Sequence, residues 1–297
     1  MKKTIAAHPW LTLLSFLWLL LVISHVEFPQ IVVDSGAFLL LGVVGAIFAN
    51  ATGAGGGVVF VPFFQQLEFT PQMSVATSFA IQCCGMTAGA LSWLQYYRFT
   101  QTDEPDWQPL ISVLKITIPV GWLGIWLVQF GFEQWLPVVS FNSFASQLHL
   151  SFGVFSVFLA VAILATMGRM THVVHTQHLT GKDKSALTLI SLLGGMVTAY
   201  LSVGIGELVA VYLIIRRFNV TMSIGAAVIL SATAVWAGSV HHLLVTHAIN
   251  WSVVLFAGAG AVLGGRIARY LVLLFPARQI KLFFAVWVLI LGILSII

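Results

Sequence analysis

The chain has 297 residues, of which 59% are hydrophobic and only 7% are charged, and its mean hydropathy is +1.01. An ordinary soluble domain carries roughly 25% charged residues, so this composition excludes a soluble fold and makes lipid the main solvent of the chain. The formal net charge of +4 is therefore interpreted as membrane topology and not as nucleic-acid binding.

Apolar runs long enough to cross the hydrocarbon core, which takes about 20 residues, follow one another along the chain. The first run, 9–23, follows Lys2 and Lys3 like the apolar part of a signal peptide, but no convincing cleavage site comes after it, so we expect a transmembrane helix. Further full spans are expected at 73–97, 109–130, 148–167, 222–245, 251–275 and 280–297.

Two other apolar segments contain glycine-rich interruptions and are expected to form pairs of half-helices. Segment 35–66 is interrupted at 49–57, and segment 186–217 is interrupted at 202–207. One constant offset along the chain aligns Gly53 with Gly204 and Gly55 with Gly206. Because unpaired backbone cannot face lipid, both interruptions are expected inside the protein or beside a wet cavity.

The placement of Lys and Arg predicts the orientation. We place the N-terminus in the cytoplasm, let every full span cross once, and let each broken pair return to the side from which it enters. The basic loop residues then all fall on the cytoplasmic side, and the C-terminus is periplasmic. Lys115, Arg266 and Arg269 lie near cytoplasmic span ends, where long side chains can reach water. The other basic residues on that side are Arg98, Arg169, Lys182, Lys184, Arg216, Arg217, Arg278 and Lys281, and the outer loops carry Glu27, Asp34, Glu68 and Glu133.

This topology predicts an all-α, polytopic membrane protein built from two inverted repeats. The first broken pair enters from outside and the second from the cytoplasm, so related sequences have opposite orientations. The expected divisions are an N-terminal transmembrane helix in 1–30 that begins the first repeat, the rest of that repeat in 31–147, a second repeat in 148–278, and an extra C-terminal helix in 279–297.

The interruptions offer a chemistry for anions. A helix that begins after each break has unpaired N–H groups and the positive end of a dipole, and glycine lets an anion approach the backbone. The alternative is that the glycines only permit close helix packing and that Ser and Thr bond to local carbonyls. The predicted substrate-binding residues are Asn50, Thr52, Gly53, Gly55, Gly56, Gly57, Thr77, Ser78, Gln82, Ser202, Gly204, Gly206, Ser231 and Thr233.

Glu207 is the one acidic residue expected deep in the membrane. An ionised carboxyl is costly there, so Glu207 is a candidate for proton coupling, protonated when the anion binds. The alternative is a neutral carboxyl that caps the helix after the break, since acidic residues suit first turns.

Other polar patterns are weaker. His172, His175 and His178 have a spacing that could bind Zn²⁺, but no cysteine or carboxylate joins them, so a solvated loop without metal is expected. The sequence has no G-x-S-x-G, H-E-x-x-H or G-x-x-x-x-G-K motif. We therefore expect neither an enzyme nor a cofactor.

The segment Gly53-Ala-Gly-Gly-Gly-Val-Val-Phe-Val-Pro-Phe, followed by Met73-Ser-Val-Ala-Thr-Ser-Phe, resembles the first-repeat motif of the TauE/SafE sulfite exporter family. The second-repeat motif is matched more loosely, because Glu207 replaces a glycine and Leu213 takes a proline position. The resemblance extends from about residue 35 to 297. It implies transport of sulfur-containing anions such as sulfite, sulfonates or sulfoacetate across a bacterial inner membrane.

The leading hypothesis is thus a secondary transporter of small sulfur-containing anions that works by alternating access, with proton coupling as an option. The alternatives are a divalent metal transporter and a membrane-bound enzyme or assembly factor of sulfur metabolism. The expected partners are the anionic substrate and the lipid bilayer, without nucleic acid, and a homodimer is left open.

Overall fold

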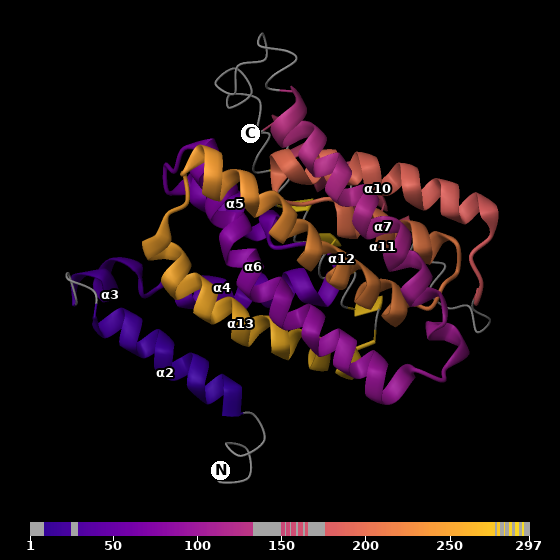
Figure 1. The fold of residues 1–297 in the computed structure, drawn as a ribbon, viewed down its shortest axis with the longest axis horizontal. Helices are drawn as coiled ribbons and strands as arrows, with labels where there is room; N and C mark the ends of the chain where they lie inside the picture. Colours follow the sequence, from indigo (N-terminus) through magenta and orange to yellow (C-terminus); the bar gives the residue numbers. More distant parts are fainter. Residues whose placement is uncertain are drawn as a thin grey trace.

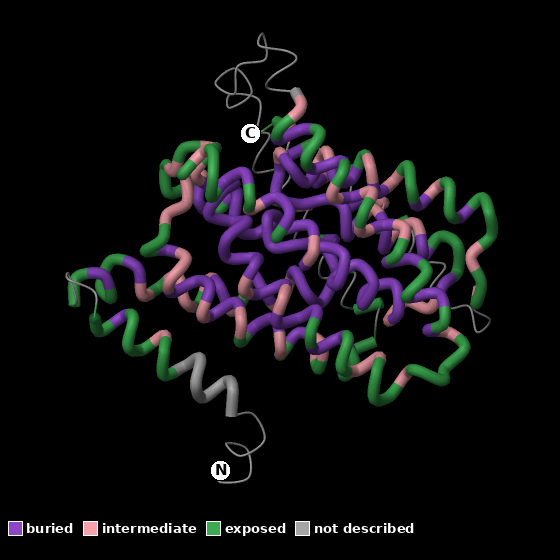
Figure 2. Tube along the Cα trace, viewed as in Figure 1, coloured by how far each residue is buried: buried purple, intermediate pink, exposed green. Residues whose placement is uncertain are grey.

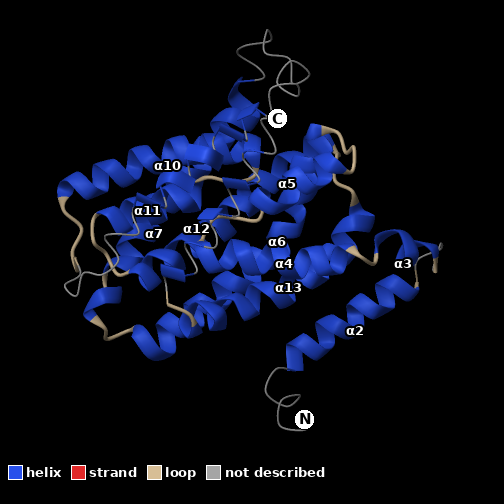
Figure 3. Ribbon diagram, turned by 180° about the vertical axis from the view of Figure 1, so that it is seen from behind, coloured by secondary structure: helices blue, strands red, loops and turns tan. Residues whose placement is uncertain are grey.

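The computed structural model describes residues 9–24, 29–132 and 176–276, together with isolated residues between 150 and 165 and between 278 and 293. Within these residues every regular element is helical and no strand occurs (Figure 3). The expected span 280–297 lies mostly outside the described residues, and in the expected span 148–167 the described residues, all helical, are separated by undescribed ones. The chain begins with α2 (Pro9–Ile23) and α3 (Gln30–Ser35).

Two series of helices follow, separated by 133–175. The first series consists of α4 (Phe38–Thr52), α5 (Gly57–Gln66), α6 (Pro71–Tyr96), η1 (Tyr97–Gln101), η2 (Pro105–Trp107), α7 (Pro109–Trp126) and η3 (Leu127–Phe132). The second series consists of α10 (Gly181–Leu201), α11 (Ile205–Ile215), α12 (Val220–His241), η4 (His242–Thr246) and α13 (Trp251–Leu274).

Six helical stretches in the described chain are long and apolar enough to cross a membrane, and α5 and α11 are shorter apolar helices beside them. The six stretches contain α4, α6, α7, α10, α12 and α13. Helix α2 coincides with the predicted first run, although its 15 residues make it shorter than these six. The prediction of an all-α polytopic membrane protein is confirmed.

The two series pack by the same scheme. Helix α4 lies along α13, and α10 lies along α7, while α5 packs on α6 and α11 packs on α12 (Figure 1). The pairing of α6 with α13 corresponds in the same way to that of α12 with α7. Exchanging α4, α5, α6 and α7 for α10, α11, α12 and α13 therefore reproduces these pairings, as a duplication predicts. The opposite orientation of the two repeats stays a prediction.

Glycines bring the paired helices close together. A Cβ atom added to Gly260 of α13 would collide with the carbonyl oxygen of Leu39 on α4. In the second pair, a Cβ atom on Gly124 of α7 would collide with the carbonyl oxygen of Leu192 on α10. Backbones approach this closely in membrane bundles because small residues allow it.

Helices α6 and α12 form the centre of the bundle and pack against each other (Figure 2). Most of their residues are buried, including Phe79 on α6 and Ile224 on α12. Large apolar side chains such as Leu40 on α4 and Leu189 on α10 are exposed instead. An exposed apolar exterior suits a protein surrounded by lipid, and the buried centre is where the interrupted helices meet.

Candidate functional site

The first interruption lies between the end of α4 at Thr52 and the start of α5 at Gly57. It is narrower than the predicted 49–57, because α4 continues through Asn50 to Thr52. Gly53 ends α4 with φ 81°, and Gly55 has φ 76°. These left-handed conformations are open to glycine at little cost, so the glycines are what allow the chain to turn here.

The second interruption lies between Leu201, the last residue of α10, and Ile205, the first residue of α11. Gly204 adopts φ 136°, which L-residues rarely adopt, and Ser202 adopts the left-handed conformation with φ 59°. A non-glycine residue with positive φ is uncommon and is enriched at functional sites. Glu207 lies in the first turn of α11.

The two interruptions touch each other at the centre of the molecule. A Cβ atom added to Gly57 would collide with the carbonyl oxygen of Ser202, and one added to Gly206 would collide with that of Gly53. The hydroxyl of Ser231 on α12 donates to the carbonyl oxygen of Gly53 over 3.3 Å. The beginnings of α5 and α11 are therefore neighbours, although they are far apart in sequence.

Gln82 of α6 connects the two interruptions. Its Oε1 accepts a hydrogen bond from the N–H of Gly56 at 2.6 Å. Its Nε2 donates to the hydroxyl of Ser202 at 2.8 Å, to the carbonyl oxygen of Ser202 at 3.1 Å, and to the hydroxyl of Ser78 at 3.0 Å. Gln82 is only 2% exposed, so one buried carboxamide bridges both breaks.

The amides at the two helix starts are not all used. In the described part of the chain, the N–H groups of Gly57, Val58 and Gly206 donate no hydrogen bond. Such groups at a helix start attract anions through their protons and the helix dipole. Among the described residues the buried side chains include no Lys or Arg, so any positive potential here comes from the backbone.

Glu207 brings an acidic group close to these amides. It is buried, and neither of its carboxyl oxygens makes a hydrogen bond of good geometry. The backbone of Gly204 and of Glu207 itself still acts electrostatically on the carboxyl, as expected for an acid in the first turn of a helix. This position suits both predicted roles of Glu207, capping and proton coupling.

Three predicted site residues use their side chains elsewhere, and a fourth, Thr52, bonds within its helix and to the first interruption. The Asn50 amide donates to the carbonyl oxygens of Ala46 and Gly85, which ties α4 to α6. The Thr77 hydroxyl accepts from the N–H of Asn250, the residue before α13. Thr52 and Thr233 donate to carbonyl oxygens within their own helices, and the Thr52 hydroxyl also accepts from the N–H of Ala54. The structure thus gathers Ser78, Gln82, Ser202, Ser231 and the glycines.

One polar residue of the second interruption was missed from the sequence. The hydroxyl of Thr198 on α10 accepts a hydrogen bond from the N–H of Ile205 at 3.0 Å and donates to the carbonyl oxygen of Gly194. It satisfies the first amide of α11 from across the break. No local motif distinguishes Thr198 from other threonines in helices, so the sequence carried no signal for it.

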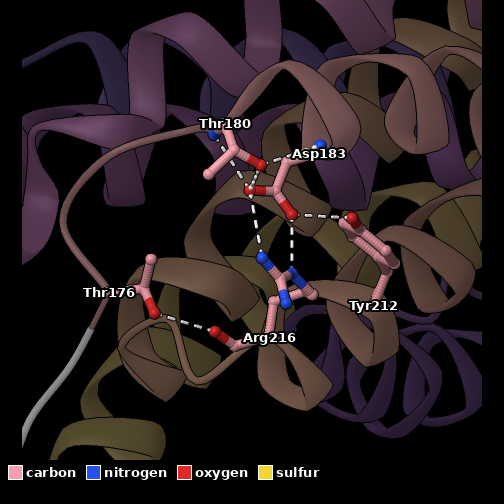
Figure 4. Close-up of polar contacts among 5 residues, drawn as sticks. All are labelled: Thr176, Thr180, Asp183, Tyr212 and Arg216. Atoms are coloured by element: carbon pink, nitrogen blue, oxygen red, sulfur yellow. Dashed lines mark hydrogen bonds and ion pairs between the residues drawn. The ribbon is translucent and has the colours of Figure 1, made fainter.

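A second polar cluster lies at the far ends of α10 and α11 (Figure 4). Buried Asp183 accepts from the Arg216 guanidinium at 2.6 Å, from the Tyr212 hydroxyl at 2.8 Å, and from the N–H and hydroxyl of Thr180. The hydrogen bond and the negative charge of Asp183 raise the pKa of Arg216. The Thr-x-x-Asp spacing of Thr180 and Asp183 is a capping-box signal that could have indicated this helix start.

The predicted histidine run is only partly described. His172 and His175 lie outside the described residues, and His178 is exposed. Among the residues that the structure describes, no group of three or more His, Cys, Asp or Glu side chains is arranged to hold a metal ion.

The comparisons with known proteins agree with the architecture. The sequence model of the family described as Sulfite exporter TauE/SafE matches residues 38–295, which contain both interruptions. Searches of curated proteins and of solved structures gave no match. Together with the six apolar helices, the family match identifies a multi-pass membrane transport protein. The chain belongs to the sulfite exporter TauE/SafE family.

Proposed function

We propose that this protein is a secondary transporter of small sulfur-containing anions, such as sulfite or a sulfonate, and that the anion binds where the starts of α5 and α11 meet. The observation that carries the proposal is the meeting of two helix starts around Gly57 and Gly206, with unused N–H groups at Gly57, Val58 and Gly206. Discontinuous helices whose starts face an anionic group are a recurrent device of secondary transporters.

The charge of the site favours a monoanion. Each helix start is equivalent to about half an elementary positive charge, so two starts supply about one unit. Apart from Glu207, the side chains around them, Ser78, Gln82, Ser202 and Ser231, are uncharged. A sulfonate, or sulfite carrying one proton, matches this potential more closely than a dianion does.

Glu207 gives a physical route to proton coupling. An ionised Glu207 in the first turn of α11 would cancel much of the potential that attracts the anion, whereas a protonated Glu207 would leave it intact. Anion and proton would then enter the site together. Glu207→Gln, which imitates the protonated form, tests this step.

The packing scheme supports alternating access. Each series of helices contributes one interruption, and the interruptions meet only at the centre. If the repeats are inverted, as the placement of basic residues predicts, rocking of one series against the other opens the same site first to one side and then to the other.

The experiment is a flux measurement in sealed proteoliposomes that contain the purified full chain. Sulfite, thiosulfate, a sulfonate and sulfoacetate are added on one side, with a divalent metal ion as a separate arm. The proposal predicts flux that depends on a sulfur anion and that loses its pH dependence in Glu207→Gln. Flux of the metal only, or product formation without net flux, would reject it.

A further inference from the structure

We infer that the carboxamide of Gln82 occupies the anion site in the empty protein, as an internal substitute for the substrate, and that the substrate must displace it. This inference rests on the proposed function, because it assigns Gln82 a role at the same site. It goes beyond that function because Gln82 is then a competitor of the anion and not a ligand of it. In the empty protein, Gln82 closes the site.

The acceptor end of Gln82 is in the position that an anion oxygen would take. Oε1 accepts from the N–H of Gly56 at 2.6 Å, directly before the unused N–H groups of Gly57 and Val58. A Cβ atom on Gly55 would lie 3.1 Å from this oxygen, and one on Gly56 would lie 2.9 Å from Cγ of Gln82. The glycines therefore form a cradle in which a carbonyl oxygen is already seated.

The donor end of Gln82 covers a carbonyl oxygen that an anion would avoid. Nε2 donates to the carbonyl oxygen and the hydroxyl of Ser202, while the Ser202 hydroxyl also contacts that of Ser78 at 3.2 Å. The carbonyl oxygen of Ser202 carries a partial negative charge and faces Gly57 at the start of α5. A neutral carboxamide, with an acceptor at one end and a donor at the other, fits both sides of this gap while the site is empty.

The same bonds hold the two interruptions together. Gln82 belongs to α6, Gly56 to the first interruption and Ser202 to the second, so its release removes the side-chain bridge between the breaks. Because an anion oxygen and Oε1 compete for the N–H of Gly56, binding of substrate and release of this bridge are one event. Gln82 thereby couples occupancy of the site to the freedom of the two series to move.

A ligand role and a competitor role predict opposite effects of shortening Gln82. If the carboxamide donated to the bound anion, Gln82→Ala would weaken binding. As a competitor, its removal frees the N–H of Gly56, and Gln82→Ala should lower the apparent Kd for the anion by about threefold or more. The empty variant should also melt at a lower temperature, since buried polar groups lose their partner.

The experiment measures sulfite and methanesulfonate binding to the purified full-length protein by calorimetry and by thermal shift. Gln129→Ala is the matched control, because Gln129 is also buried and donates between helices, to the carbonyl oxygen of Gly238, away from the breaks. The expected result is tighter binding in Gln82→Ala and a Kd in Gln129→Ala like that of the wild type. Unchanged or weaker binding in Gln82→Ala overturns the inference.

A second variant decides the case if Gln82→Ala fails to fold. Gln82→Glu has the same size and presents a tethered carboxylate to the N–H of Gly56, so it should abolish binding of added anion at neutral pH. Wild-type affinity in Gln82→Glu would overturn the inference. Absence of binding and flux in both the wild type and Gln129→Ala would reject the proposed function itself, whereas wild-type binding without tightening in Gln82→Ala rejects only the role of Gln82.

Discussion

The two broken helix pairs are alike at the centre of the bundle and different at their far ends. At the centre, each pair turns through glycine or serine with positive φ and starts a new helix against the other pair. At the far end of the first pair, Phe38 at the start of α4 packs on Phe64 near the end of α5, with ring centroids 6.2 Å apart. At the equivalent place in the second pair, Asp183 binds Arg216.

The far ends of the two pairs are therefore held together by different interactions, aromatic packing in the first pair and an ion pair in the second. Phe64 also stacks on Phe69, with centroids 5.2 Å apart, in an apolar cluster that excludes water. Asp183 is buried but fully hydrogen-bonded, and Arg216 keeps contact with solvent, with 45% of its side chain exposed. The far ends thus differ in chemistry, whereas the central turns and helix starts are alike in both pairs, as the proposed anion site requires.

The largest expected effect is at the centre of the bundle, where the two breaks touch. Gly57→Ala and Gly206→Ala each place a methyl group against the backbone of the opposite break, so each should reduce transport by about 100-fold, since small displacements at a reacting or binding geometry are that costly. Flux in proteoliposomes measures the loss. Gly181→Ala is the control, because a Cβ atom there meets nothing within 4 Å. Near wild-type flux in Gly57→Ala and Gly206→Ala would show that transport does not depend on the contact between the two breaks.

At the far end of the first pair, Phe64→Ala should lower the free energy of unfolding by about 3–5 kcal/mol, because it empties a fully buried aromatic position. Denaturant unfolding in detergent gives this value. Phe63→Ala should cost much less, because Phe63 is 42% exposed. Equal losses in the two variants would contradict an aromatic anchor centred on Phe64.

At the far end of the second pair, Asp183→Asn should lower the free energy of unfolding by about 2 kcal/mol, because the charge-assisted bond from Arg216 is lost while the size is kept. The same unfolding assay applies. Lys182→Gln changes a neighbouring exposed charge and should leave stability almost unchanged. A loss of the same size in Lys182→Gln would mean that general charge, and not this network, matters.

The smallest expected effect separates the members of that network. Tyr212→Phe removes only the hydroxyl that donates to Asp183 and should cost about 1 kcal/mol. Combined with Asp183→Asn, its effect should be less than additive, because Asp183→Asn already weakens the hydrogen bond that Tyr212→Phe removes. A fully additive double variant would place the Tyr212 hydroxyl outside the network.

The sequence predicted the fold well because hydropathy and glycine placement act locally. The first interruption is narrower than predicted because the polar residues at its edge bond within the helix. Asn50 donates to Ala46, and Thr52 donates to Phe48, each four residues back, so α4 accommodates both before Gly53 ends it. Polar side chains near a break therefore do not mark where the helix ends, and the predicted boundary at residue 49 is wrong.

The central site was predictable only in part. Ser78 and Gln82 are four residues apart on α6 and so share a face, which explains why both reach Ser202. Thr77 was grouped with them by proximity in sequence, but one residue turns the side chain toward Asn250. The bridging role of Gln82 and the Asp183 network depend on tertiary contacts that no local pattern encodes.

The most direct test of the central claim is to locate a bound anion. Selenite, a heavier analogue of sulfite, can be diffused into crystals of the full-length protein and found by anomalous scattering from selenium. The account predicts one strong peak between the N–H groups of Gly57 and Gly206, with the Gln82 side chain withdrawn from Gly56. A bound selenite in another part of the bundle, with both breaks unchanged and Gln82 still bonded to Gly56, would contradict it.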